Sequence, residues 1–398
     1  MNYRKIRNEE ANKFAKLSAT AFHSNAENAY KEIEEGEFQE QTIRVLENDE
    51  GKFIAGLKLF ELHMWLDTQY VKAGGIGDVA SYPEYRRGGN VSSIMSSALK
   101  EMCENDYVIS YLYPFSHPFY RKYGYELCRK KDIISFETSD IEYAKDAGYV
   151  KQHIADSEDD LSEDIKKIYN QYAKKMNFMV NREGWFWDRI LNKDAYKSKA
   201  KVYVFYLPDD TPIAYFLYQY ENIEFASLRA KIFDIAFVSK QAFDVILRFI
   251  YKLAPSIKEV VMTCPAIING FEILDDSWQV KMRSEPGGMM RIVNVQKTLE
   301  TIKKPNTNST VVIKVHDKDI DGNNGVYTIK LNNGMSRVIK NDSKEPDMEC
   351  SVQVLAQLVC GFRCIDEVIH RKDIKVNSKY VDLNKLFVKK PIHIQDFF

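Results

Sequence analysis

The sequence predicts an α/β protein in which helices cover mixed β-sheets. Three observations lead to this class. Apolar runs of strand length alternate with segments of helical spacing in the N-terminal third, a similar order of elements recurs after residue 145, and a further group of strands and helices follows residue 287. A chain of 398 residues corresponds to two or three domains at about 150 residues per domain.

The N-terminal third contains the clearest elements. Residues 3–7 form a strand-like run, and Phe14, Leu17 and Ala21 lie on one helix face in a stretch that starts at residue 8. Asparagine, aspartate and glycine at 48–51 supply the turn between two strands. The other elements expected here are helices at 25–33, 90–105 and 118–123 and strands at 42–48, 52–63, 72–81 and 107–113.

The rest of the chain also alternates strands and helices, but its middle part has no Gly-rich turn between a strand and a helix. The elements expected in the middle part are helices at 160–175, 183–191 and 241–253 and strands at 202–205, 212–220, 231–238 and 258–263. The elements expected in the last part are strands at 290–295, 309–317, 325–332 and 336–341 and helices at 296–302 and 351–360. We therefore expect three domains, at 1–145, 146–286 and 287–398.

Composition excludes several classes of protein. Hydrophobic residues make up 45% and charged residues 28% of the chain, which is ordinary for a globular protein and excludes bulk disorder. The 56 basic and 57 acidic side chains balance to a net charge of -1, so we expect neither nucleic-acid binding nor a polybasic membrane anchor. The sequence has no apolar run near 18 residues and no signal-peptide core at its start.

The cysteines indicate a reducing compartment. Six of them are scattered through the chain, as expected for reduced thiols of a cytoplasmic protein. Cys360 and Cys364 could share a helix face, but no second pair of ligands lies nearby. We therefore expect no metal site.

One turn in the N-terminal part carries chemical information. A strand that ends at Ser81 is followed by Arg86-Arg87-Gly88-Gly89, and a helix begins near Asn90. Glycines let a backbone approach a phosphate closely, a helix N-terminus attracts anions, and arginines add bidentate donors. The turn predicts a pyrophosphate site, with a merely solvated turn as the alternative. The spacing is not that of a nicotinamide dinucleotide fingerprint.

A second segment, Phe119-Tyr120-Arg121-Lys122-Tyr123-Gly124-Tyr125, lies about 30 residues further on. Together the two segments resemble the GNAT superfamily of N-acetyltransferases. The R-x-x-G-x-G/A turn of that family corresponds to residues 86–91, with Val91 in place of the final small residue, and its later F-Y-x-x-x-G-F/Y element corresponds to residues 119–125.

A closer resemblance covers nearly the whole chain. The length, the second and degenerate acetyltransferase-like part, and the segments 355–363, 383–387 and 391–398 resemble the Eis-type (enhanced intracellular survival) acetyltransferases. The resemblance implies two tandem GNAT-like mixed-sheet domains, followed by an α+β domain similar to a sterol carrier protein. It also implies that only the first domain carries the cofactor turn.

The resemblance further implies acetyl-CoA as co-substrate and no metal. The strand before the turn would run along the pantetheine arm, the turn would hold the phosphates, and Ser116 would line the thioester region. The implied cofactor-binding residues are Val79, Ser81, Arg86, Arg87, Gly88, Gly89, Asn90, Val91 and Ser116.

Two catalytic groups follow from the same resemblance. Tyr120 matches the tyrosine that acts as general acid, and a tyrosine with a pKa near about 10 is protonated at neutral pH. The terminal carboxylate, here on Phe398, would be the general base, ionised at a pKa near about 3.5. The alternatives are a packed aromatic at 120, simple hydrophobic anchoring of the end of the chain, and a base at His117.

The acceptor is less defined. Phe22, Tyr30 and Trp65 are candidates for its aromatic wall, and Asp396 or Glu34 could attract a cationic amine. The resemblance implies transfer of acetyl to a primary amine, such as an aminoglycoside or a polyamine, by a trimer-based hexamer. Two other functions remain open: a carrier of lipids or other hydrophobic ligands, and an acyl-CoA sensor without turnover.

Overall fold

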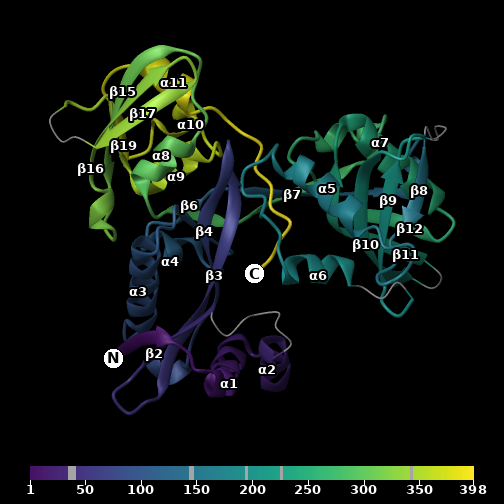
Figure 1. Cartoon of the computed structure of the whole chain (residues 1–398), viewed down its shortest axis with the longest axis horizontal. Coiled ribbons are helices and arrows are strands. Elements are labelled where there is room, and N and C mark those ends of the chain that lie inside the picture. The colour runs from purple at the N-terminus through teal and green to yellow at the C-terminus, as the bar shows by residue number, and fades with distance from the viewer. Residues whose placement is uncertain (35–41, 143–147, 193–195, 225–226, 341–343) are drawn as a thin grey trace. The chain divides into compact units, whose positions relative to one another are not determined.

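The computed structural model describes residues 1–34, 42–142, 148–192, 196–224, 227–340 and 344–398 (Figure 1). These residues form two compact units. The first unit contains residues 1–129, 287–390 and the terminal Phe398, and the second contains residues 130–286 and 391–397. No helix in the described ranges is long and apolar enough to cross a membrane.

The first unit contains a mixed seven-stranded sheet, as predicted. Its order is β1 (Asn2–Lys5), β2 (Ile43–Glu47), β3 (Phe53–Leu66), β4 (Gln69–Ser81), β5 (Ile109–Leu112), β14 (Met289–Ile292) and β6 (Glu126–Leu127). Only β4 and β5 run parallel, and the other neighbours are antiparallel. A parallel pair needs a crossover, and here it is made by α3 (Asn90–Glu104), the helix predicted at 90–105.

A core lies on each face of this sheet. One contains Phe14 and Leu17 of α1 (Ala11–Phe22), with Ile33 of α2 (Ala26–Glu34). The other contains apolar residues of α3 and Tyr120 of the short helix α4 (His117–Arg121). The helical spacing read from the sequence therefore places the correct faces inward.

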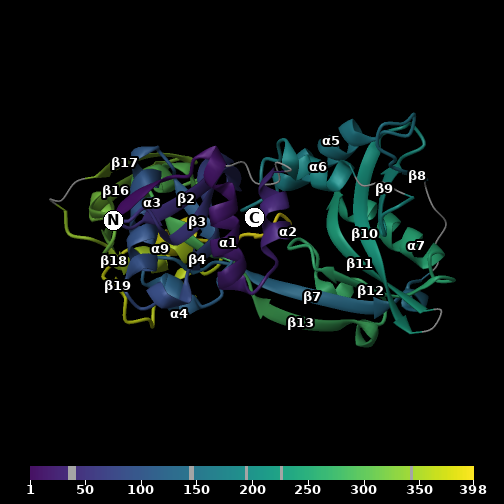
Figure 2. The ribbon, with the colours of Figure 1, turned by 90° about the horizontal axis from the view of Figure 1, so that it is seen from below.

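The second unit repeats the same strand topology around a second seven-stranded sheet. Its order is β13 (Lys281–Pro286), β7 (Lys130–Glu137), β12 (Ile257–Thr263), β11 (Ser227–Phe237), β10 (Pro212–Glu224), β9 (Ala200–Tyr206) and β8 (Tyr149–Gln152), and Figure 2 shows β7 beside β13. Its helices are α5 (Ser162–Ala173), α6 (Trp185–Leu191) and α7 (Lys240–Lys252). Again one neighbouring pair, β11 and β12, is parallel.

The two sheets exchange strands across the expected domain limits. Strand β7 precedes residue 145 but pairs in the second sheet, and β14 follows residue 287 but pairs with β5 and β6 in the first. The limit at 145 itself falls in 143–147, outside the described residues. Strand-forming residues do not specify which sheet a strand joins, so the sequence could not show this exchange.

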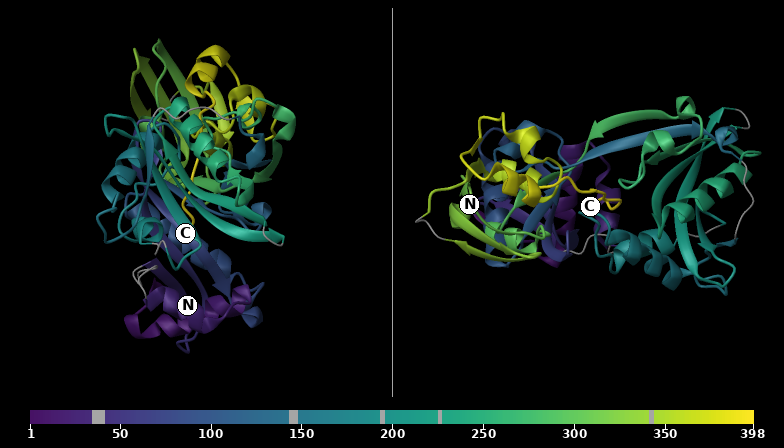
Figure 3. Two further views of the ribbon diagram at one scale, coloured as in Figure 1. Left: turned by 90° about the vertical axis from the view of Figure 1, so that its right-hand side faces the viewer. Right: turned by 90° about the horizontal axis from the view of Figure 1, so that it is seen from above.

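A third, five-stranded sheet belongs to the first unit. Its order is β17 (Met335–Lys340), β16 (Gly325–Asn332), β15 (Asn308–His316), β18 (Met348–Ser351) and β19 (Ile374–Val376), with helices α8 (Val295–Thr301), α9 (Val352–Val359), α10 (Ile365–Val368) and α11 (Tyr380–Leu386). The predicted strand at 336–341 is β17, and position 341 lies outside the described residues. After α11, residues 391–398 form an extended segment without helix, which is the last part of the yellow chain in Figure 3.

Candidate active site

The parallel strands β4 and β5 separate within the first sheet. They pair only over 73–76 and 109–112, whereas β4 continues to Ser81. From Gly77 to Ser81 the edge of β4 that faces away from β3 therefore has no strand partner among the described strands. Backbone N–H and C=O groups on such an edge can pair with an extended ligand. Val79 and Ser81, the predicted pantetheine-binding residues, lie on this stretch.

A β-bulge marks the point where β4 leaves β5. The register between β3 and β4 shifts between Gly56 and Lys58, and Asp78 has a positive φ of 49°. The Lys58 ammonium lies 2.7 Å from the Asp78 carboxylate. Because a bulge bends and twists its strand, this one turns the end of β4 away from β5.

The predicted phosphate turn leads from β4 into α3. Residues 86–89 are exposed, and Gly89 is the N-cap of α3 with a φ of 79°. Within the described ranges no side chain caps this helix end, and a Cβ atom placed on Gly89 would have no described atom within 4 Å. The Asn90 amide donates to the carbonyl of Tyr85 at 2.8 Å and so closes the turn. The amide groups of a helix's first turn have no acceptors within the helix and favour an anion.

Val91, the departure from the family pattern, does not enter this turn. Its side chain packs against the core that contains Ile94 and Leu99 of α3. A β-branched residue fits here because the side chain points into the core, while the approach to the turn is left to Gly88 and Gly89.

Tyr120 lies buried on α4, with 3% of its surface exposed. Its ring packs against Phe115, Phe119 and Tyr125 at centroid distances of 5.4, 5.1 and 6.2 Å. Burial raises the pKa of Tyr120 well above the ordinary tyrosine value, and the neighbouring Tyr125 and Tyr123 raise it further. The phenol is therefore a proton donor throughout the neutral range.

The hydroxyl groups of this tyrosine cluster differ in their partners. Tyr123 shares a hydrogen bond with Ser92 at 2.8 Å, and Tyr125 shares one with Ser110 at 2.7 Å. No described residue hydrogen-bonds the Tyr120 hydroxyl. Of the three, Tyr120 is thus the one whose hydroxyl is available to a ligand, while Tyr123 and Tyr125 use theirs within the fold.

Ser116 and His117 lie at the start of α4. Ser116 is its half-buried N-cap, and its carbonyl accepts from the Tyr120 amide at 3.3 Å. The Nε2 atom of His117 is buried and has no hydrogen-bond partner among the described residues. His117 therefore stays an alternative to the terminal carboxylate as base.

The terminal residue packs directly on β4. The Phe398 ring lies 5.8 Å from Phe60 and 5.8 Å from Tyr113, centroid to centroid. A Cβ atom at Gly75 would come within 2.6 Å of this ring, and a Cβ atom at Gly77 would lie 3.3 Å from the carbonyl carbon and oxygen of Phe398. The two glycines thus make room for the end of the chain, and its carboxyl group lies where β4 leaves β5.

The sequence contains a signal for this arrangement that was not used. Residues 73–77 read Ala-Gly-Gly-Ile-Gly within a strand. Glycine weakens a strand interior and often marks the close approach of another segment. Gly75 and Gly77 are therefore site residues that sequence reasoning missed.

The predicted aromatic wall is not brought together. Phe22 ends α1 and is 51% exposed, whereas Tyr30 packs against the core that contains Ala80. Trp65 packs edge-to-face against Tyr70, with ring centroids 4.7 Å apart, at the far end of the β3–β4 hairpin. The seven residues from Tyr70 to Gly77 span about 23 Å of strand, so Trp65 lies away from the terminal carboxyl group. The Glu34 side chain lies outside the described residues.

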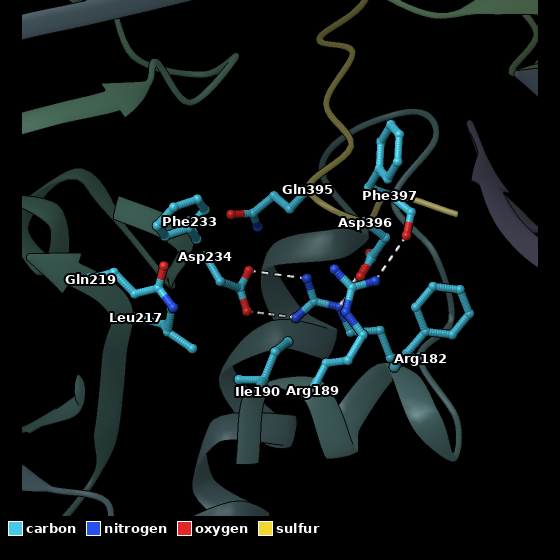
Figure 4. A pocket seen from close by; sticks show the side chains of 11 residues that line it. Arg182, Arg189, Ile190, Leu217, Gln219, Phe233, Asp234, Gln395, Asp396 and Phe397 are labelled. Carbon is cyan, nitrogen blue, oxygen red and sulfur yellow. Dashed lines mark hydrogen bonds and ion pairs between the residues drawn. The ribbon is translucent and has the colours of Figure 1, made fainter. Parts of the chain in front are cut away.

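Asp396, the predicted acceptor ligand, lies in the second unit (Figure 4). It lines a cavity of about 260 Å³ formed by α6, β10, β11 and residues 395–397. Its carboxylate accepts from Nε of Arg182 at 2.9 Å, and Arg182 also donates to Asp234 at 2.7 Å. Burial raises the pKa of Asp396, and Arg182 opposes that shift. The Asp396 carboxylate is thus already paired with a buried arginine.

Comparisons with known proteins assign three domains to the chain. Family models match residues 2–128 and 179–292 as acetyltransferase (GNAT) domains and residues 295–394 as a sterol carrier protein domain. No curated protein matches the chain. Several solved structures share the fold over the full chain.

A GCN5-related N-acetyltransferase from Anabaena variabilis is 22% identical with a TM-score of 0.89, and the match covers 100% of both chains. A probable N-acyltransferase from Enterococcus faecalis is 24% identical with a TM-score of 0.86, covering 100% of this chain and 99% of the other. Eis1 from Mycobacterium abscessus is 16% identical with a TM-score of 0.82, covering 100% of both.

The chain contains two GNAT acetyltransferase domains followed by a sterol carrier protein domain. Two GNAT domains before a sterol carrier domain confirm the predicted fold and the predicted enzyme class. Enzymes of this family transfer an acetyl group from acetyl-CoA, and small-molecule amines are their acceptors. The turn at 86–91 and Tyr120 both lie within the first of these GNAT domains.

Removing both arginines of the turn tests its assignment. Arg86→Ala with Arg87→Ala is expected to raise KM for acetyl-CoA about tenfold or more, since a charged hydrogen bond contributes about 1.5–3 kcal/mol. The rate at saturating acetyl-CoA should change little, because neither arginine has a role in the proton transfers of the chemical step. Lys100→Ala, at the other end of α3, is the matched control. An unchanged KM in the double variant means that the turn does not hold the phosphates.

Proposed function

We propose that this protein transfers the acetyl group of acetyl-CoA to a primary amine, with Tyr120 as general acid and the terminal carboxylate of Phe398 as general base. One observation carries the proposal. The carboxyl group of Phe398 lies against Gly77, on the stretch of β4 whose edge is open to a ligand. The core that packs on this sheet buries Tyr120 of α4, whose hydroxyl group no described residue hydrogen-bonds.

The reaction assigns one task to each group. The neutral amine attacks the thioester carbonyl carbon, so that a C–N bond forms and the C–S bond breaks. The proton lost by the amine goes to the terminal carboxylate, directly or through water, and Tyr120 gives its proton to the departing thiolate. Backbone N–H groups of β4 beyond Gly77 stabilise the charge that develops on the carbonyl oxygen.

Two features support the pantetheine placement. The open stretch of β4 carries Val79 and Ser81, and it ends four residues before the arginine turn. An arm that pairs with this edge would lead from the phosphate turn toward Gly77. Asn90 and the glycines of the turn would contact the phosphates through the backbone of α3.

The acceptor we favour is a small amine such as an aminoglycoside or a polyamine. Of the predicted contacts in the first unit, Tyr30 fits best because it packs against the core that contains Ala80 of β4. Asp396 belongs to the second unit, where it lines a cavity and pairs with Arg182. Phe22 and Trp65 would contribute less. A cytoplasmic, trimer-based hexamer is the assembly we propose with this function.

Thiol release tests the proposal. Native protein and a variant extended by several residues beyond Phe398 are incubated with acetyl-CoA and a panel of aminoglycosides and polyamines. We expect acceptor-dependent release that falls at least about 100-fold in the extended variant, the range of a lost general base. The extension should matter because a peptide bond after Phe398 converts its carboxylate into an amide carbonyl, which cannot act as a base, and carries the new terminal carboxylate away from Gly77.

The other outcomes separate the alternatives. Equal release from both proteins would exclude the terminal base and leave His117 as the candidate. Binding of acetyl-CoA without release for any acceptor would indicate a sensor. Uptake of a fatty acyl probe without acetyl-CoA would favour the lipid carrier.

A further inference from the structure

The second GNAT domain has the same separated strands as the first. Strands β11 and β12 pair in parallel from Leu228 to Ile232, and β11 then continues to Phe237. A bulge between β10 and β11 follows the last parallel pair, as between β3 and β4. The stretch 233–237 of β11 therefore corresponds to the open stretch 77–81 of β4.

In the second domain this edge is occupied by the chain itself. The Gln395 amide accepts from the Ile235 N–H at 2.8 Å and donates to the Ile235 carbonyl at 2.9 Å. One side chain thus makes the two hydrogen bonds that an extended ligand or a neighbouring strand would make with β11.

Further contacts fix the residues that precede Gln395. The Asn177 N–H donates to the carbonyl of Pro391, and the His393 N–H donates to the carbonyl of Asn177, both at 3.0 Å. Asp396 pairs with Arg182 at 2.9 Å, and Ile394 is 3% exposed. Residues 391–396 are thus fixed at successive positions within the second unit.

The helix that follows β11 also differs from its counterpart. Helix α7 is capped by Ser239, whose side chain accepts from the Ala242 N–H, whereas α3 begins at Gly89 without a side-chain cap. The N-terminus of α7 thus has an acceptor of its own. Both features that the first domain leaves open, the strand edge and the helix end, are occupied in the second.

We infer that the carboxy-terminal segment is an internal ligand of the second GNAT domain, and that Gln395 is a positioning residue for the terminal carboxylate. Gln395 precedes Phe398 by three residues, which span at most about 10 Å. Fixing Gln395 to Ile235 therefore limits the positions that the carboxylate can take. A displacement of about 1 Å at a catalytic group can cost about 100-fold in rate. The inference rests on the proposed role of the Phe398 carboxylate.

The test compares variants at 395 in two backgrounds. Gln395→Ala removes both hydrogen bonds to Ile235, whereas Gln395→Glu keeps an acceptor for the Ile235 N–H and loses the donor to the Ile235 carbonyl. Gln296→Ala, on α8 and with an exposed partner, is the matched control. In the chain without an extension we expect Gln395→Ala to lower kcat about tenfold or more. The kcat of Gln395→Glu should lie between those of native protein and Gln395→Ala. The Kd for acetyl-CoA should stay within about twofold of native in each variant.

The second background is the chain extended beyond Phe398, in which the terminal carboxylate is already displaced. There we expect Gln395→Ala to cost no further rate, because the two changes act on one group. An equal loss in both backgrounds would mean a merely structural role and overturn the inference. A native rate for Gln395→Ala in the native chain would overturn it as well, while leaving the proposed function intact.

A second experiment does not depend on turnover and therefore tests the inference even if the proposed function is wrong. Carboxypeptidase A removes terminal phenylalanine, and intact mass follows the removal. If the native chain releases no thiol, or releases it equally with and without the extension, the terminal base is wrong, and the digestion alone tests the internal ligand. If Gln395→Ala loses Phe398 faster than native protein and Gln296→Ala do, the result supports Gln395 as the residue that fixes the end of the chain. Equal rates overturn the inference.

Discussion

Replacing Tyr120 by phenylalanine is expected to lower kcat by about 100-fold or more, the range of a lost general acid. The substitution removes only the hydroxyl group, which no described residue hydrogen-bonds, and keeps the ring contacts with Phe115, Phe119 and Tyr125. The stability of the fold and the Kd for acetyl-CoA should therefore change little. Thiol release and a thermal melt measure the two effects separately.

Tyr123→Phe is the matched control, because Tyr123 belongs to the same cluster and its hydroxyl is paired with Ser92. Its kcat should stay within about threefold of native, since a neutral hydrogen bond contributes only about 1 kcal/mol. Equal losses in the two variants would show that the cluster as a whole, and not the Tyr120 proton, supports turnover. A native rate for Tyr120→Phe would remove Tyr120 from the acid role.

The pH profile adds an independent check on this assignment. Burial holds the pKa of Tyr120 well above its ordinary value. Since the phenol stays protonated, loss of the Tyr120 proton should not produce an alkaline limb in kcat below about pH 10. A limb near neutrality that persists in Tyr120→Phe belongs to another group.

Local patterns allowed much of the first domain to be predicted. The strand that ends at Ser81, the helix that starts at Asn90 and the short helix with Tyr120 are where the spacing placed them. Each of these elements depends on residues close together in the sequence. No strand was predicted at residues 130–137, and the expected domain limits placed both β7 and β14 with their neighbours in sequence, yet β7 pairs in the second sheet and β14 in the first. Pairing depends on partners far along the chain, which a single sequence does not reveal.

The same distinction applies to the site. The arginine turn and Tyr120 are short motifs and could be read directly. The seat of Phe398 on Gly75 and Gly77 joins segments more than 300 residues apart, and the bond of Gln395 to Ile235 spans 160 residues. Trp65 shows the converse limit, because residue type alone suggested it, whereas its position at the far end of the β3–β4 hairpin depends on the strand register.

Arg182→Met is expected to lower the free energy of unfolding by about 3–5 kcal/mol, the cost of breaking a buried ion pair by removing one partner. Arg182 is buried, bonds both Asp234 and Asp396, and lies over the Tyr169 ring at 4.0 Å. Methionine would fill most of its volume but would leave two buried carboxylates without their cation. Arg189→Met, an exposed neighbour on α6, is the control and should cost less than about 1 kcal/mol.

The size of this loss should depend on pH, and the direction follows from the carboxylates. In the native protein burial already raises the pKa of Asp396 above its unfolded value, so its contribution to stability is largest below about pH 4 and declines as pH rises through the folded pKa. Without Arg182 the opposing cation is gone and that pKa should rise further. Denaturant titrations of variant and native protein at pH 5 and pH 8 should therefore show the smaller difference at pH 5, because the Asp396 carboxyl group can then be protonated more readily. A difference that is equal at both pH values would assign the loss to packing around Tyr169 and not to charge.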